Sequence, residues 1–452
     1  MSESKQTGID MLSPKGLTRK LIIFALPILA CGVVQQSFNA IDVAVVGKYV
    51  GHEALAAVGA NGPVISLLIN LFMGLSLGSN VLIANYMGQQ NFTGIKKAVD
   101  TSIALAIACG AIMLAGGWFS ATWLLDMLDT PHDIIDSASD YLRIFVLGFP
   151  GMMLFNFGSA ILRSIGDTKR PFYCLVAGGL VNVTLNLFFV LMLKMGVEGV
   201  AIATTISNYV SGFLVIALLT KENSIVKVVI KEIRSYKTEL NKIIRIGLPA
   251  GIQGMVFALS NVFIQSGINS FGAETISGSA AALNYEFYCY FIVVAFTQAA
   301  IAFIGQNFGA GQFRMCRTIY NRCFILCIAL CAFCNIAIVC LHADAIRIFS
   351  DNPAVIKFGG ERICGVLAFQ FIACSYEVAG GALRAIGYSV LPMIITIVGT
   401  CVLRVSWTWG HTWNTFKELL VIYPVTWVIT GISMIIAYYI IARKVLPIMK
   451  SI

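Results

Sequence analysis

The chain has 452 residues, of which 58% are hydrophobic and only 12% are charged. A soluble protein has about a quarter of its residues charged, so this chain lacks the polar surface needed to cover a globule in water. The composition therefore excludes a soluble globular protein. The formal net charge of +9 is explained by membrane topology, and we expect no nucleic acid partner.

Long stretches without a charged residue occur along the chain, for example 54–95 and 246–273. Runs of about 18 or more apolar residues are long enough to cross a bilayer as helices. The sequence predicts an all-α integral membrane protein with twelve spans. They cover roughly 18–45, 55–85, 100–124, 144–162, 171–193, 199–220, 244–270, 276–304, 320–341, 363–383, 388–410 and 419–442.

The distribution of Lys and Arg predicts the orientation of these spans. Most basic residues fall in the loops that share a side with both termini, whereas the 126–140 loop on the other side has Asp and no Lys or Arg. Cytoplasmic loops carry the excess of basic residues, so we expect both termini in the cytoplasm. Residues 1–20 are polar and basic and precede no small-residue cleavage site, which predicts an uncleaved anchor.

Thirteen Cys residues raise the question of metal or redox chemistry. Four of them lie at helical spacing within one predicted span, Cys323, Cys327, Cys331 and Cys334, and no His accompanies them. Cys is an ordinary small apolar residue inside a helix. We therefore predict no metal or cofactor at these positions, and no cofactor elsewhere.

The sequence repeats itself across its two halves. The clearest match is Leu162-Arg163-x-Ile165-Gly166, which recurs as Leu383-Arg384-x-Ile386-Gly387. Each repeat holds six spans, an even number, so both halves have the same orientation, as in transporters built from parallel repeats. We predict two parallel six-helix bundles, 1–220 and 243–452, joined by a cytoplasmic linker at 221–242.

Four ionisable residues lie well inside predicted spans: Asp42, Glu286, Glu377 and Arg404. A charge at the bilayer centre costs at least about 2.5–3.5 kcal/mol, which makes each one a functional candidate. The structural alternative is a residue that faces a wet cavity, or a fixed ion pair that holds helices together.

Depth along the helices groups Asp42 with three polar residues of spans 5 and 6. Asn182 and Asn186 are one helical turn apart, and Thr204 lies at a similar depth, given a rise of about 1.5 Å per residue. A carboxylate, two amides and a hydroxyl suit a hard cation such as Na⁺, or a proton on Asp42. The alternative is a hydrogen-bond cluster between helices. The second repeat has Ile264, Leu403 and Trp407 at the corresponding positions.

The second half has its own charged set. Glu286 and Arg404 both lie in the outer half or the middle of their spans, whereas Glu377 is nearer the cytoplasm. Opposite charges in a low-dielectric setting are less costly together than apart. We therefore predict that Glu286 and Arg404 form a pair, and that Glu286 or Glu377 adds negative charge where it faces a substrate cleft.

Several stretches, taken in order, resemble the multidrug and toxic compound extrusion (MATE) family over nearly the whole chain. They are Leu26-Pro27, the run 42–47, the run 53–59, the run 203–207, the run 305–311 and both Leu-Arg-x-Ile-Gly turns. The resemblance implies an antiporter that exports mostly cationic, amphipathic compounds in exchange for Na⁺ or H⁺. It also implies coupling through Asp42 with Asn182, Asn186 and Thr204, although several members have Asp where this chain has Asn186.

Two other readings stay open. A flippase for lipid-linked sugars or lipids of the same superfamily would be favoured by a cationic cavity and extra spans. A membrane enzyme would need a catalytic pair such as two intramembrane Asp residues or an HExxH motif, and the sequence has neither. We expect a non-enzymatic, monomeric transporter of small-molecule cations in a cell membrane, specifically a bacterial inner membrane.

Overall fold

The computed structural model describes residues 9–127, 130, 132–410 and 413–446. Every regular element within these residues is a helix, which confirms the predicted all-α class. The two chain ends, whose cytoplasmic location is predicted above, lie outside the described residues at 1–8 and 447–452.

Two compact units make up the described chain. The N-terminal unit contains residues 9–10 and 30–251, and the C-terminal unit contains residues 11–29 and 252–446. Two helices therefore belong to both units, α1 (Leu17–Val45) and α8 (Lys237–Asn269), and each has a Pro inside it close to the division, Pro27 and Pro249. The division into bundles at 220 and 243 stays a prediction from the repeat; the predicted linker ends inside α8.

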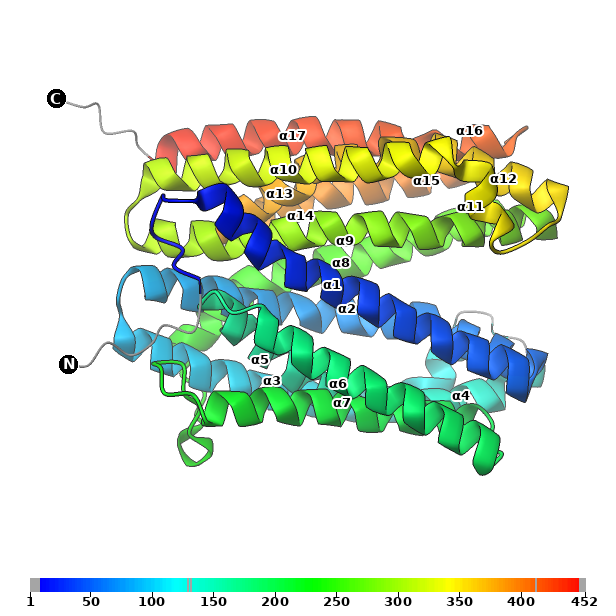
Figure 1. Cartoon of the computed structure of the whole chain (residues 1–452), viewed down its shortest axis with the longest axis horizontal. Coiled ribbons are helices and arrows are strands. Elements are labelled where there is room, and N and C mark those ends of the chain that lie inside the picture. The colour runs from blue at the N-terminus through cyan, green and yellow to red at the C-terminus, as the bar shows by residue number, and fades with distance from the viewer. Residues whose placement is uncertain (1–8, 128–129, 131, 411–412, 447–452) are drawn as a thin grey trace. The chain divides into compact units, whose positions relative to one another are not determined.

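Within each unit the long helices run along the horizontal direction of Figure 1. Besides its parts of α1 and α8, the N-terminal unit has η1 (Val46–Val50), α2 (His52–Gly88), α3 (Phe92–Asp126), α4 (His132–Val146), α5 (Phe149–Ser164), α6 (Lys169–Leu187), η2 (Phe188–Met192), α7 (Val197–Thr220) and η3 (Ile230–Glu232). The C-terminal unit has α9 (Ala273–Gly309), α10 (Phe313–Cys340), α11 (His342–Arg347), α12 (Pro353–Gly365), η4 (Leu367–Ile372), α13 (Ala373–Ala385), α14 (Val390–Thr396), η5 (Ile397–Val402), α15 (Leu403–Gly410), α16 (Phe416–Leu420) and α17 (Ile422–Val445).

Length and composition account for the predicted spans. Eleven helical stretches among the described residues are long and apolar enough to cross a membrane, and the pair Asp133–Val146 and Phe149–Ser164, bent by 45°, gives up to twelve. Large apolar side chains such as Phe119, Phe333 and Ile432 are exposed on the helices. An apolar exterior of this kind is stable in lipid and not in water.

The repeated Leu-Arg-x-Ile-Gly sequence ends a helix in the same way in both units. Gly166 and Gly387 have φ of +90° and +92°, a left-handed conformation that glycine adopts without steric cost. In each turn the glycine N–H donates to the Arg carbonyl and the next N–H donates to the Leu carbonyl. This is a Schellman cap, which satisfies carbonyls left free at the helix end.

Close glycine contacts join α2 to the first part of α8 in the N-terminal unit. A Cβ atom at Gly74 would lie 2.1 Å from the backbone nitrogen of Gly251, and one at Gly78 would lie 2.4 Å from the carbonyl oxygen of Ile243. Small residues spaced four apart let membrane helices approach at backbone distance. Glycine is therefore required at this crossing.

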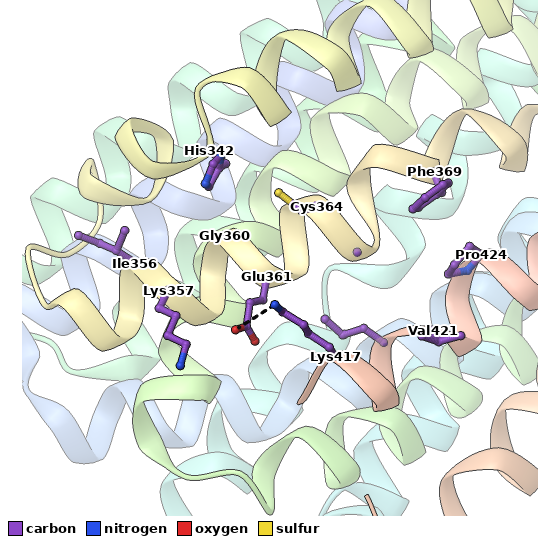
Figure 2. Close-up of a pocket in the computed structure, with 12 residues that line it drawn as sticks. His342, Ile356, Lys357, Gly360, Glu361, Cys364, Phe369, Lys417, Val421 and Pro424 are labelled. Atoms are coloured by element: carbon purple, nitrogen blue, oxygen red, sulfur yellow. Dashed lines mark ion pairs between the residues drawn. The ribbon is translucent and has the colours of Figure 1, made fainter. Parts of the chain in front are cut away.

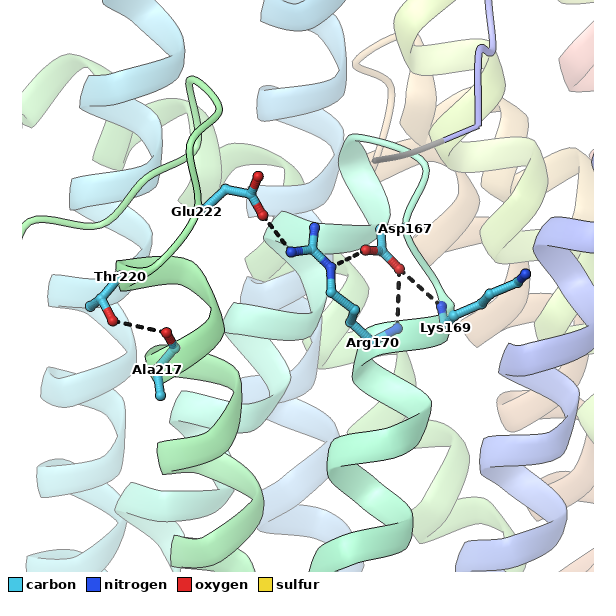
Figure 3. A network of polar contacts seen from close by, with 6 residues as sticks. All are labelled: Asp167, Lys169, Arg170, Ala217, Thr220 and Glu222. Atoms are coloured by element: carbon cyan, nitrogen blue, oxygen red, sulfur yellow. Dashed lines mark hydrogen bonds and ion pairs between the residues drawn. The ribbon is translucent and has the colours of Figure 1, made fainter. Parts of the chain in front are cut away.

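A charged network ties the start of α6 to the end of α7, as Figure 3 shows. Asp167 Oδ1 accepts hydrogen bonds from the backbone N–H groups of Lys169 and Arg170, each at 3.1 Å. The guanidinium of Arg170 forms ion pairs with both Asp167 and Glu222. Asp167 thus satisfies free N–H groups of the first turn of α6, and Arg170 links that turn to the chain after α7.

Candidate functional site

Two adjacent glycines allow α6 to lie against α1 and α7 at once. A Cβ at Gly179 would lie 1.6 Å from the Phe38 ring of α1, and one at Gly178 would lie 1.9 Å from the Ser211 hydroxyl of α7. Gly179 lies one helical turn before Asn182 on the chain, and Phe38 lies one turn before Asp42. The missing side chains therefore bring the polar residues of α1 and α6 within reach of each other.

The four residues predicted in this unit form one hydrogen-bonded cluster. The Asn186 amide donates to Asp42 Oδ1 and, at 3.4 Å, to Asn182 Oδ1. The Asn182 amide donates to Thr204 Oγ1 at 3.2 Å, and that hydroxyl donates to the Val200 carbonyl at 2.9 Å. Residues that the sequence placed at similar depth in their helices are therefore in contact in the structure.

One oxygen of the cluster is left over. Asn186 is fully buried, and its Oδ1 has no hydrogen-bond partner among the described residues. Asp42 is half-buried and accepts from the amide nitrogen of the same Asn186 side chain. Buried acceptors are usually paired, so a cluster that holds a carboxylate and an unpaired amide oxygen can take a small cation or a proton.

Two of the three helices that carry this cluster, α1 and α6, become π-helical just beyond it. The π-helical segment η1 begins four residues after Asp42, η2 begins two residues after Asn186, and the two segments contact each other. Single π-helical turns within α-helices are frequent at functional sites, because they redirect backbone groups and side chains. Neither π-helical segment was predicted from the sequence.

The predicted pair between Glu286 and Arg404 is wrong. Both carboxylate oxygens of Glu286 accept from Arg362 instead, Oε1 from Nε at 2.6 Å and Oε2 from Nη2 at 3.0 Å. Ser279 Oγ accepts from Arg362 Nη1 at 2.8 Å, and the Glu286 carbonyl accepts from Gln370 at 2.8 Å. Similar depth does not fix the direction in which a side chain leaves its helix, and Glu286 points toward α12.

Arg362 was missed because the predicted span 10 began at 363. In the structure this span runs over Pro353–Ala385 and includes the 3₁₀-helical segment η4, which places Arg362 inside it with 2% of its surface exposed. A signal was available. Extending the span by one residue brings a fifth ionisable side chain into the membrane, and a buried carboxylate calls for a cationic partner.

Among the described residues, the hydrogen-bond acceptors of Arg404 are neutral. Its Nη1 donates to Asn261 Oδ1 at 3.0 Å and its Nε to Thr426 Oγ1 at 3.4 Å. Its Cζ lies 4.5 Å from the centre of the Tyr423 ring and 5.2 Å from that of Phe257. The side chain is 1% exposed, and no described residue accepts a hydrogen bond from Nη2.

The third predicted charge of this unit, Glu377, accepts a hydrogen bond from the Tyr290 hydroxyl at 3.1 Å. Arg384, seven residues further along α13, is buried and donates to Gln253 at 2.7 Å. Glu377 is half-buried. Within the described residues, no group of three or more His, Cys, Asp and Glu side chains is placed to hold a metal ion.

A wide hollow of about 830 Å³ lies where α11, α12 and α16 approach one another (Figure 2). Glu361 and Lys417 form an ion pair at 3.8 Å on its wall, with Lys417 exposed. Such exposed pairs contribute little to stability or binding. We assign no function to this hollow.

Comparisons with known proteins agree with the fold. A family model described as MatE matches residues 27–188 and 249–409. The probable multidrug resistance protein YpnP of Bacillus subtilis is 26% identical over 86% of this chain and 87% of its own length. The probable multidrug resistance protein NorM of Thermotoga maritima is 28% identical over 84% and 83%. A solved outward-facing multidrug resistance MATE family transporter superposes with a TM-score of 0.90 at 20% identity, over 98% and 99% of the two chains.

Proposed function

This chain belongs to the MatE family of membrane transporters, and we propose that it is a cation-coupled antiporter that exports amphipathic, mostly cationic compounds. Its relatives in Bacillus subtilis and Thermotoga maritima are both named as probable multidrug resistance proteins. The observation that carries the coupling part of the proposal is the Asp42 cluster, in which a carboxylate accepts from the Asn186 amide nitrogen while the oxygen of that amide has no partner among the described residues.

The coupling ion acts on Asp42 in this proposal. Protonation or Na⁺ binding neutralises the Asp42 carboxylate. This neutralisation weakens the carboxylate as an acceptor of the hydrogen bond from Asn186. An ion moves a conformational equilibrium only by the difference in its affinity for the two states. The hydrogen bond from Asn186 to Asp42 joins α6 to α1, so a change at the carboxylate alters the contact between these two helices.

The ion itself is H⁺ or Na⁺. A proton needs only the Asp42 carboxylate, whereas Na⁺ needs several oxygens, and Asn186 Oδ1, Asn182 Oδ1 and Thr204 Oγ1 are the available neutral ones. Asn186 is an amide and not a second carboxylate, so the cluster has one formal charge. We further propose that the chain works as a monomer in a bacterial inner membrane with both termini in the cytoplasm.

Dye transport in proteoliposomes tests this function. The full chain is reconstituted, and ethidium movement is followed under an imposed pH gradient and, separately, under an imposed Na⁺ gradient. We expect one of the two gradients to drive transport, and Asp42→Asn to abolish it while the protein remains folded. Gradient-driven transport by folded Asp42→Asn would refute the role of Asp42. Transport of a lipid-linked sugar, and of no cation, would favour the flippase.

A further inference from the structure

The C-terminal unit contains a cavity of about 210 Å³ whose wall includes three charged side chains. These are Glu286 on α9, Arg362 on α12 and Arg404 on α15. The volume is smaller than the roughly 300–1,000 Å³ of pockets for drug-sized ligands. It therefore suits a compact molecule, or one end of a longer one.

Two of the three charges neutralise each other. Arg362 and Glu286 form a bidentate pair, the geometry in which guanidinium and carboxylate bind most strongly, and Ser279 Oγ accepts a hydrogen bond from the remaining Nη1 of Arg362. The pair is nearly buried on both sides. This leaves the cavity with the positive charge of Arg404.

Arg404 is held in place by its surroundings without being neutralised by them. The Asn261 and Thr426 oxygens accept from Nη1 and Nε, and the Tyr423 and Phe257 rings lie near the guanidinium. Aromatic faces and neutral oxygens stabilise a cation only partly, and a buried charge without a counter-charge is costly. Nη2 remains without an acceptor among the described residues.

A second unpaired atom lines the same cavity. Gln370 is buried, its amide nitrogen donates to the Glu286 carbonyl, and its Oε1 has no donor within the described chain. Arg404 and Gln370 both line the cavity, and each has one buried polar atom without a partner among the described residues, a cationic donor and a neutral acceptor. Apolar ring surface from Phe287, Tyr290 and Trp427 makes up much of the remaining wall.

We infer that this cavity is a binding site for a small aromatic carboxylate that also carries a hydrogen-bond donor. The carboxylate accepts from Arg404 Nη2, the donor reaches Gln370 Oε1, and the ring packs against the aromatic wall. The site lies in a different unit from the Asp42 cluster. A site of this kind adds organic acids, and the acidic end of zwitterions, to the cationic compounds proposed above. The inference does not depend on whether Asp42 couples transport.

Binding to the purified full chain tests the site directly. The probe is 4-aminobenzoate, and its methyl ester is the matched ligand, with the same ring and amine but no charge. Calorimetric titration should show tighter binding of the acid than of the ester by about ten- to hundredfold, the range expected when a hydrogen bond to a charged group is lost. Equal affinity for acid and ester, or no binding of the acid, would overturn the inference.

Variants then assign the binding to Arg404. Arg404→Gln should lower the affinity for the acid by a similar factor and leave the affinity for the ester unchanged. Arg404→Lys should give an intermediate affinity for the acid, because Lys keeps the charge but loses the planar fork of the guanidinium. Arg347→Gln is the matched control, since Arg347 is an exposed arginine of the same unit that pairs with Asp344. Unchanged acid binding in Arg404→Gln would refute the assignment. The comparison of acid with ester uses the unaltered chain, so it tests the inference even where a variant does not fold.

Discussion

At the scale of single residues, Asp42 and Arg404 are two charges of opposite sign, and the hydrogen bonds of each within the described residues go to neutral partners. Asp42 is half-buried among amides, whereas Arg404 is buried against aromatic rings. A charged side chain inside the membrane costs free energy, so an ionisable residue found there is a candidate for a function. We therefore place ion coupling at Asp42 and ligand charge recognition at Arg404, in separate units.

The pair of Glu286 with Arg362 is expected to be a structural requirement of the C-terminal unit. Glu286→Gln or Arg362→Gln leaves a charge buried without its partner, which should lower the free energy of unfolding by about 3–5 kcal/mol. The loss of unfolding free energy in the double variant should be clearly smaller than the sum of the losses in the two single variants. Unfolding of the purified chain in detergent, followed by circular dichroism, measures each value.

A control for this cycle lies on the same helix. Glu361 and Lys417 form a longer pair at 3.8 Å, in which the Lys417 side chain is 70% exposed. Because water screens this pair, Glu361→Gln and Lys417→Gln should each change stability by at most about 1 kcal/mol. Additive losses in the Glu286 and Arg362 series, or losses no larger than those of the control pair, would show that the buried pair does not stabilise the unit.

The residues of the N-terminal cluster could be predicted from sequence, and the pairing in the C-terminal unit could not. Depth along a helix follows from counting residues, so Asp42 and Asn186 were placed at the same level. The direction of a side chain around its helix does not follow from depth, which is why Glu286 was paired with Arg404. Arg362 was missed because the predicted tenth span began one residue after it, whereas the span in the structure begins at Pro353.

At the scale of elements, the contact between α1 and α6 depends on the absence of a side chain at Gly179. Gly179→Ala would place a Cβ 1.6 Å from the Phe38 ring, so the ring or the helix must move. Overpacking of this kind costs about 1–3 kcal/mol. We expect Gly179→Ala to lower the melting temperature and to reduce gradient-driven dye transport severalfold.

Two further variants make this prediction specific. Phe38→Ala in the Gly179→Ala background should restore part of the transport by making room for the added methyl group. Gly116→Ala on α3 is the matched control, because a Cβ there would meet nothing within 4 Å, and alanine favours helix by about 1 kcal/mol. If Gly179→Ala behaved like Gly116→Ala, the close contact would not position the cluster.

Helix boundaries and irregular segments set the limit of prediction at this scale. Hydropathy located the long apolar runs, but the fourth span is a pair of helices bent by 45° and the tenth is interrupted by η4. The π-helical segments beside Asp42 and Asn186 also had no sequence signature. Each depends on packing against neighbouring helices, which the local sequence does not contain.

At the scale of the whole molecule, the repeat and the charge bias are the properties that the sequence expresses most clearly. The two Leu-Arg-x-Ile-Gly turns adopt the same cap at Gly166 and Gly387, and the apolar runs account for eleven to twelve spans. These features recur over many residues, so a local error does not remove them. The division of α1 and α8 between two units was not foreseen.

The excess of basic residues on one side predicts that both termini are cytoplasmic. Green fluorescent protein fused to the C-terminus should fluoresce in bacterial cells, because it folds in the cytoplasm. An epitope inserted between α3 and α4 should be reached by antibody from the outer side of spheroplasts. A dark fusion together with an epitope reached only after the cells are opened would invert the proposed orientation.

Exchange of an ion for a substrate is the central claim, and substrate-driven ion movement tests it most directly. Proteoliposomes holding the purified chain, with no ion gradient, receive ethidium on one side, and H⁺ and ²²Na⁺ movement is recorded. Coupling predicts that one of these ions moves opposite to the dye, and that Asp42→Asn stops the ion movement. Dye movement without movement of either ion, or ion exchange that persists in folded Asp42→Asn, would contradict the claim.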